Sequence, residues 1–110
     1  MKHFTVRQFK DACHARYLGP EEVLDQELSG IETDSRAVTK GTLFVAIPGE
    51  RVDGHKFIPD VYAKGAVCAL SQQELTDPTG PYLLVEDTQQ ALKEAAESYR
   101  QTLGIPVIGI

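Results

Sequence analysis

Residues 33–57 read TDSRAVTKGTLFVAIPGERVDGHKF, and this stretch decides the fold. Its centre, residues 43–47, carries no polar side chain, which predicts a β-strand that is buried on both faces. Strands of this kind belong to parallel or mixed sheets that helices cover. The stretch therefore predicts an α/β fold, a small three-layer domain with a mixed or parallel sheet and helices on both faces.

A polar loop, residues 48–55, follows this strand and leads toward a helix. Open α/β sheets bind ligands at the carboxyl ends of their strands, which is where this loop lies. Gly49 and Gly54 suit tight turns or a close approach of the backbone to a ligand. The residues alone leave two interpretations open, a solvated connection and a ligand-binding loop. Asp34 and Ser35 in the preceding turn are open in the same way, because such side chains often bind their own backbone.

Capping residues predict a helix near the amino terminus. Thr5 and Gln8 have the spacing of a capping box, and Phe4 and Phe9 have that of a hydrophobic staple. The helix is expected to end near Ala15.

Further along the chain, apolar runs alternate with helix signals. The expected strands are residues 29–33, 67–70, 82–85 and 107–110, the expected helices are residues 57–64 and 87–103, and residues 16–18 form a short extended piece. Pro59 suits the first turn of a helix, Gly65 suits the position after its end, and Asp87 can cap the last helix. The acidic residues 21–28 are interpreted as a solvated connection. We expect a mostly buried core that contains Phe44, Val45, Ile47, Val67, Cys68, Leu84 and Leu92.

Length, charge and cysteine spacing limit the function. A chain of 110 residues fits one domain, and a formal net charge of −5 without a basic run argues against nucleic-acid binding. No apolar run reaches the roughly 20 residues that span a bilayer, and the first residues lack the apolar region of a signal peptide. Cys13 and Cys68 have neither metal-site nor redox-motif spacing. We therefore expect a cytoplasmic monomer with reduced thiols, no membrane contact and no metal site.

Four sequence elements resemble the signature of the Mur ligases, which build the peptide stem of bacterial cell-wall precursors. In order, they are Asp34-Ser35-Arg36, the strand and loop of residues 41–57, Gly65-Ala66, and Val85-Glu86-Asp87-Thr88 followed by Ala91-Leu92. The resemblance covers residues 29–110. Within the family, the chain is most similar to the branch that adds D-alanyl-D-alanine to a UDP-N-acetylmuramoyl-tripeptide. The branch that adds the third amino acid to the dipeptide is the alternative within the family. Residues 53–55 and 85–88 favour the branch that adds D-alanyl-D-alanine.

The resemblance implies that the chain recognises the uridine diphosphate part of a UDP-N-acetylmuramoyl peptide, with Ser35 at the uracil end. The implied substrate-binding residues are Ser35, Gly49, Glu50, Arg51, Asp53, Gly54 and His55, and the supporting residues are Asp34, Arg36, Phe44 and Ala46. We expect Ser35, Arg51, Asp53 and His55 to rim one cleft near the carboxyl end of the strand at residues 43–47. Arg36 is expected to brace the site by pairing with Asp34 or Asp53.

The resemblance also implies that substrate binding and ATP binding belong to different domains. Residues 1–104 would form the UDP-sugar-binding domain, and residues 105–110 the first strand of an absent ATP-binding domain. In the family such a strand runs into a Gly-rich phosphate loop ending in Gly-Lys-Thr or Gly-Lys-Ser, which this sequence lacks. The parent enzyme would use ATP and Mg²⁺ to add D-alanyl-D-alanine, and this chain alone is expected to have no catalytic residue and no ligase activity. A stand-alone nucleotide-binding module is the alternative from another class of protein.

Overall fold

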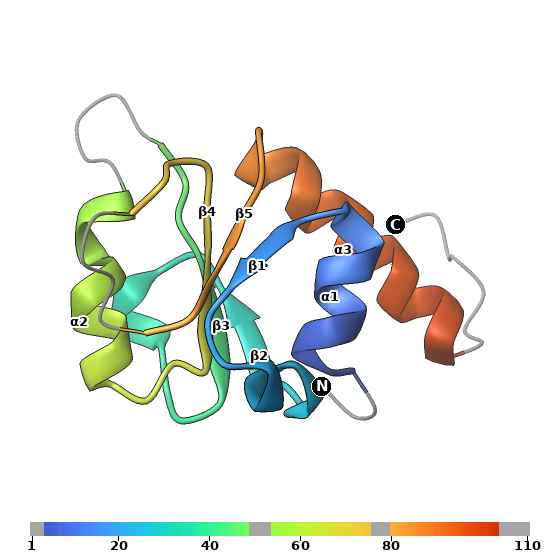
Figure 1. Cartoon of the computed structure of the whole chain (residues 1–110), viewed down its shortest axis with the longest axis horizontal. Helices are drawn as coiled ribbons and strands as arrows, with labels where there is room; N and C mark the ends of the chain where they lie inside the picture. The colour runs from blue at the N-terminus through green and yellow to red at the C-terminus, as the bar shows by residue number, and fades with distance from the viewer. Residues whose placement is uncertain (1–3, 49–53, 76–79, 104–110) are drawn as a thin grey trace.

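The computed structural model (Figure 1) describes residues 4–48, 54–75 and 80–103 of the chain. Within them, a five-stranded mixed sheet runs through the centre of the molecule. Its strands are β1 (Arg16–Leu18), β2 (Gly30–Glu32), β3 (Thr42–Val45), β4 (Cys68–Ser71) and β5 (Tyr82–Leu84), in the spatial order β1-β5-β4-β3-β2. Strands β2 to β5 are parallel, and β1 pairs with β5 in the antiparallel sense.

Helices cover both faces of this sheet (Figure 1). Helices α1 (Val6–Cys13) and α3 (Thr88–Leu103) lie together on one face, and α2 (Ile58–Ala63) lies on the other. Three short 3₁₀ turns complete the described elements, namely η1 (Glu21–Asp25), η2 (Ser35–Ala37) and η3 (Gly54–Phe57). The predicted three-layer α/β architecture with a mixed sheet is confirmed.

Strand β3 separates two apolar clusters, one on each face of the sheet. Leu43 and Val45 belong to the cluster under α1 and α3, whereas Phe44 and Ala46 belong to the cluster under α2. All four are fully buried, because successive side chains of a strand point to opposite faces and both faces are covered. This arrangement is the physical reason why the strand has no polar side chain.

The seven expected core residues divide into two groups. Phe44, Val45 and Cys68 have no exposed surface, whereas Ile47, Val67, Leu84 and Leu92 are partly buried and contact the edges of the two clusters. The first group lies on β3 and β4 at the centre of the sheet. The second group lies at or next to strand ends, except Leu92, which lies on α3. The predicted core is therefore located correctly, and its rim is more open than its centre.

Helix α1 begins as its capping residues predict. The Thr5 hydroxyl oxygen accepts a hydrogen bond from the Gln8 backbone N–H at 3.2 Å, and the Gln8 side-chain oxygen accepts one from the Thr5 N–H at 2.8 Å. The Phe4 and Phe9 rings meet edge to face, with their centroids 6.5 Å apart. The helix ends at Cys13, before the predicted Ala15, because His14 turns into the left-handed region with a φ of 55°.

The interpretation of residues 21–28 as a solvated connection is wrong. Part of this segment forms η1, and Leu24 and Leu28 are buried in the cluster under α1 and α3. The Leu28 N–H also donates to the Phe4 carbonyl at 2.8 Å, which attaches the segment to the start of α1. The acidic side chains of this segment face solvent. Because these charges dominate the composition, the sequence pattern did not reveal the two core leucines, which lie four positions apart.

Candidate functional site

The carboxyl ends of β3, β4 and β5 lie along one edge of the sheet, at the top of Figure 1. The chain enters α2 and α3 from this edge, which we call the carboxyl edge. In open α/β sheets this is where ligands bind. Most of the predicted site residues belong to the loop after β3, and four of them lie outside the described residues: Gly49, Glu50, Arg51 and Asp53.

His55 lies in η3, which Gly54 begins, and its side chain is turned inward. Only 7% of its surface is exposed, and its Nε2 atom accepts a hydrogen bond from the Gln72 backbone N–H at 3.0 Å. Since Nε2 is the acceptor, this bond requires an imidazole with no proton on that nitrogen. His55 therefore connects the segment before α2 to the end of β4, and its predicted contact with a substrate stays a prediction.

Gln72 continues this connection to the start of α3. Its side-chain oxygen accepts hydrogen bonds from the Thr88 N–H and from the Thr88 hydroxyl, each at 3.2 Å. Thr88 is fully buried, so both of its donors need a partner inside the protein. The neighbouring Asp87 accepts from the backbone N–H groups of Gln89 at 2.9 Å and Gln90 at 3.1 Å, which confirms its predicted role as a cap.

Three loops of the carboxyl edge thus meet at one residue. His55 follows β3, Gln72 follows β4 and Thr88 follows β5. His55 and Thr88 belong to the sequence motifs described above, whereas Gln72 belongs to none of them. A signal was available, because Gln72 is a polar residue directly behind a buried strand, where ligand-binding and loop-fixing residues concentrate.

The turn that contains Ser35 is braced from two sides. The Asp34 carboxylate accepts from the Arg36 backbone N–H at 2.9 Å and from its guanidinium at 3.1 and 3.0 Å. These hydrogen bonds from Arg36 hold the pKa of Asp34 below its ordinary value. The Ser35 carbonyl accepts from the Lys64 ammonium at 2.7 Å, which ties the turn to the end of α2. Of the two predicted partners of Arg36, Asp34 is confirmed, and Asp53 lies outside the described residues.

The two supporting residues on β3 and just after it are interior residues. Phe44 and Ala46 are fully buried in the cluster under α2. The Ala46 N–H donates to the Leu70 carbonyl at 3.0 Å, so the backbone stays paired to β4 up to the beginning of the loop. These residues can support a site by fixing where the loop starts.

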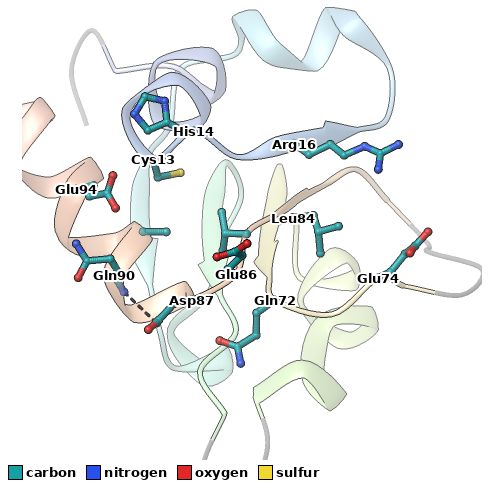
Figure 2. Close-up of a pocket in the computed structure, with 12 residues that line it drawn as sticks. Cys13, His14, Arg16, Gln72, Glu74, Leu84, Glu86, Asp87, Gln90 and Glu94 are labelled. Carbon is teal, nitrogen blue, oxygen red and sulfur yellow. Dashed lines mark hydrogen bonds between the residues drawn. The ribbon is translucent and has the colours of Figure 1, made fainter.

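A separate groove of about 670 Å³ lies between the end of α1, the end of β5 and the start of α3 (Figure 2). Its apolar floor contains Leu84, Val85 and Ala91, and its acidic side chains are Glu74, Glu86, Asp87 and Glu94. None of the predicted site residues lines this groove. Gln72, which the sequence did not predict, is one of its lining residues. In the part of the chain that the structure describes, no group of three or more His, Cys, Asp or Glu side chains is arranged to hold a metal ion.

The length and hydropathy of the described helices can be compared with those of membrane-spanning segments. None of these helices is both long enough and apolar enough to cross a bilayer.

Cys13 and Cys68 are buried and form no disulfide, and burial raises the pKa of both thiols.

Comparison with known proteins places the chain beside one group of enzymes. The family described as "Mur ligase family, catalytic domain" matches residues 27–100. The UDP-N-acetylmuramoyl-tripeptide--D-alanyl-D-alanine ligase of Synechocystis sp. is 36% identical over 109 residues, which cover 97% of this chain and 24% of the relative. A UDP-N-acetylmuramoyl-L-alanyl-D-glutamate--2,6-diaminopimelate ligase from Chlorobium phaeobacteroides is 43% identical over 75 residues, 66% of this chain and 15% of the relative.

A solved structure gives the same grouping. MurF from Acinetobacter baumannii superposes with a TM-score of 0.79 and 30% identity, over 92% of this chain and 22% of that one. The chain therefore spans between 15% and 24% of the length of these relatives.

Proposed function

This chain belongs to the Mur ligase family, and we propose that it binds the uridine diphosphate part of a UDP-N-acetylmuramoyl-tripeptide for a ligase that adds D-alanyl-D-alanine. The observation that carries this proposal is the match to the Synechocystis ligase over 97% of the chain. The similarity to MurF from A. baumannii over 92% of the chain supports it. The family match over residues 27–100 includes the signature residues His55 and Thr88, which are joined through Gln72.

The proposed ligand contacts remain those that the sequence predicts. Ser35 would contact the uracil end, and the loop after β3 with Gly49, Glu50, Arg51, Asp53, Gly54 and His55 would contact the diphosphate. In support, the Ser35 turn is braced by Arg36 and Lys64, so its backbone is held in one arrangement before a ligand arrives. Pre-formed sites lose less conformational entropy on binding.

A second candidate function stays within the family. The C. phaeobacteroides ligase that adds 2,6-diaminopimelate has the higher identity, 43%, over a shorter part of the chain. The two candidates share the uridine diphosphate ligand and differ in the amino component. An assay of the complete enzyme separates them, because only D-alanyl-D-alanine or only the diamino acid would be consumed together with ATP.

The remaining steps are proposed for the complete enzyme. There, ATP and Mg²⁺ would activate the peptide carboxylate as an acyl phosphate, and the amine of D-alanyl-D-alanine would then displace phosphate. This sequence contains no Gly-Lys-Thr or Gly-Lys-Ser element, so we assign no residue of the chain to ATP or Mg²⁺. We further propose that the enzyme acts in the cytoplasm as a monomer, without nucleic acid and away from the membrane.

A titration of the 110-residue chain with UDP, followed by amide NMR, tests the proposed ligand. We expect shifts at Ser35 and across residues 49–55, because the ligand would lie against these backbone groups. ADP and inorganic diphosphate are the control ligands, and weaker shifts with both would show that the uracil is recognised. Saturating UDP without any amide shift would contradict the proposal.

Ser35→Ala locates the uracil end of the site. We expect it to weaken UDP binding, whereas Ser29→Ala should leave the affinity unchanged. The Ser29 hydroxyl donates to the Lys40 carbonyl at 2.9 Å, so the control exchange also removes a serine hydroxyl, but outside the proposed site.

A further inference from the structure

Gln72 connects two parts of the carboxyl edge through two different groups. Its backbone N–H donates to His55 Nε2, and its side-chain oxygen accepts from the N–H and the hydroxyl of Thr88. His55 precedes α2 and Thr88 begins α3, and these helices lie on opposite faces of the sheet. Among the described residues, Gln72 therefore links one loop to the other.

Burial makes this connection costly to break. Thr88 is fully buried and His55 is 7% exposed, so neither residue can replace a lost partner with bulk water. A buried donor or acceptor that loses its partner carries its full desolvation cost. Among the described residues, no buried side-chain nitrogen or oxygen lacks a hydrogen-bond partner, so the structure satisfies all of these groups together.

We propose that Gln72 is a positioning residue for the uridine diphosphate site. It holds the start of α3 and the segment around His55 in the one relative arrangement that the ligand binds. This inference rests on the proposed function, because it assigns Gln72 a task in that site. Gln72 itself need not touch the ligand.

Gln72 can change the affinity for UDP by changing the fraction of molecules in the binding-competent arrangement. When the two loops are no longer joined, the binding-competent arrangement is only one of several that the carboxyl edge can adopt. The apparent affinity then falls in proportion to the fraction of molecules in the competent arrangement. A residue that raises this fraction increases the affinity without making a ligand contact.

Two substitutions of Gln72 separate the hydrogen-bonding role from side-chain size. Gln72→Leu keeps a similar volume but has no acceptor for Thr88. Gln72→Glu keeps an oxygen that can accept both bonds, and its negative charge is favourable at the start of a helix. Both variants retain the backbone N–H that His55 binds, so they test the half of the connection that leads to Thr88.

The measurement is a UDP titration of the 110-residue chain followed by amide NMR. We expect Gln72→Leu to bind UDP about tenfold more weakly, which corresponds to about 1.4 kcal/mol. Gln72→Glu is expected to stay within about twofold of the parent chain, as an acceptor is retained. UDP should also shift the Thr88 amide in the parent chain and in Gln72→Glu, but not in Gln72→Leu.

Two control variants exclude a general loss of stability, and a third variant is a second test of the connection. Leu24→Ala empties a buried position in η1, at the opposite end of the molecule from the carboxyl edge, and should keep the parent affinity although it unfolds at a lower temperature. Gln89→Leu makes the same exchange at an exposed residue of α3 and should change nothing. Thr88→Val removes only the hydroxyl and is a milder variant should Gln72→Leu fail to fold; we expect about threefold weaker binding.

The outcomes distinguish the two proposals. If the parent chain does not bind UDP, the proposed function and this inference both fail. If the parent binds UDP and Gln72→Leu binds equally well, the inference alone is overturned. An equal loss of affinity in Leu24→Ala would also overturn it, since the effect would then follow stability rather than position. Should Gln72→Leu not fold, unchanged affinity in Thr88→Val would have the same consequence.

Discussion

Val45 lies at the centre of β3 and has no exposed surface. We predict that Val45→Asp abolishes folding, because an unpaired carboxylate there would be buried between the sheet and helices α1 and α3. The cost of such a charge is comparable with the whole stability of a small domain, about 5–15 kcal/mol. Circular dichroism during heating should show no cooperative transition.

Two controls accompany the Val45→Asp variant. Val45→Ala should remain folded at reduced stability, since it leaves a cavity but no charge. Ala63→Asp places the same carboxylate on the exposed side of α2 and should unfold close to the parent temperature. A cooperative transition of Val45→Asp within a few degrees of the parent would show that β3 is placed wrongly.

The two thiols are predicted to be unreactive in the native protein. Burial raises the pKa of Cys13 to about 11 and that of Cys68 to about 12, so almost no thiolate is present near neutral pH. Iodoacetamide should label neither residue in the folded chain and both in concentrated guanidinium chloride. Fast labelling of Cys68 without denaturant would contradict its burial in β4.

The same thiols predict a fall in stability at alkaline pH. Their pKa in the unfolded chain is near the ordinary value of 9.0, below the native values. Above pH 9 the unfolded state therefore releases protons that the native state keeps, and stability is lost as the pH rises toward 12. Denaturant midpoints measured across this range should decrease, and less so in Cys68→Ala.

For single residues, a sequence motif can predict which residue belongs to a site but not the direction of its side chain. The family resemblance predicts His55 as a site residue, yet its side chain is bound by Gln72, which is 17 positions away in the sequence. Such a contact cannot be read from local sequence. By contrast, the pairing of Arg36 with Asp34 spans two positions and is one of the two pairings that the sequence predicts.

At the level of elements, the turn between α2 and β4 depends on Gly65. This residue has a φ of 103°, and a Cβ atom there would lie 2.9 Å from the Lys40 Cα atom. We predict that Gly65→Ala lowers the free energy of unfolding by more than about 1 kcal/mol, because both the backbone conformation and the space oppose a side chain.

Gly30→Ala is the matched control for Gly65→Ala. It adds the same methyl group to β2, where the new carbon would meet no atom within 4 Å beyond its chain neighbours and φ is not in the left-handed region. Its unfolding free energy should be unchanged or slightly higher, because alanine restricts the unfolded chain. Equal effects of the two exchanges in urea titrations would contradict the close approach of Lys40.

Elements with strong end signals were predictable from the sequence, and those without them were not. The caps of α1 and α3, Pro59 and Gly65 all act within a few residues, so sequence spacing revealed them. Strand β1 has three residues and gains its identity only from antiparallel pairing with β5. Its role, like the strand order, is decided by contacts between distant segments.

For the whole molecule, the layered architecture follows from the burial of β3 on both faces. Its side chains alternate between the cluster under α1 and α3 and the cluster under α2. A strand with this environment needs a covering layer on each side, which is why its apolar composition predicted three layers. The loops at its carboxyl end are then the place where the fold can vary without disturbing either cluster.

The whole chain is predicted to bind UDP without turning over ATP. Phosphoryl transfer depends on holding the phosphates in position and stabilising their charge, which a Gly-rich loop with its Lys and a bound Mg²⁺ provide in ATP-using enzymes. The 110 residues contain no Gly-Lys-Thr or Gly-Lys-Ser element. With UDP and D-alanyl-D-alanine present, phosphate release by the purified chain should equal that of buffer. ATP turnover that disappears on exchange of one residue of this chain would contradict the prediction, since such activity could not come from a contaminant.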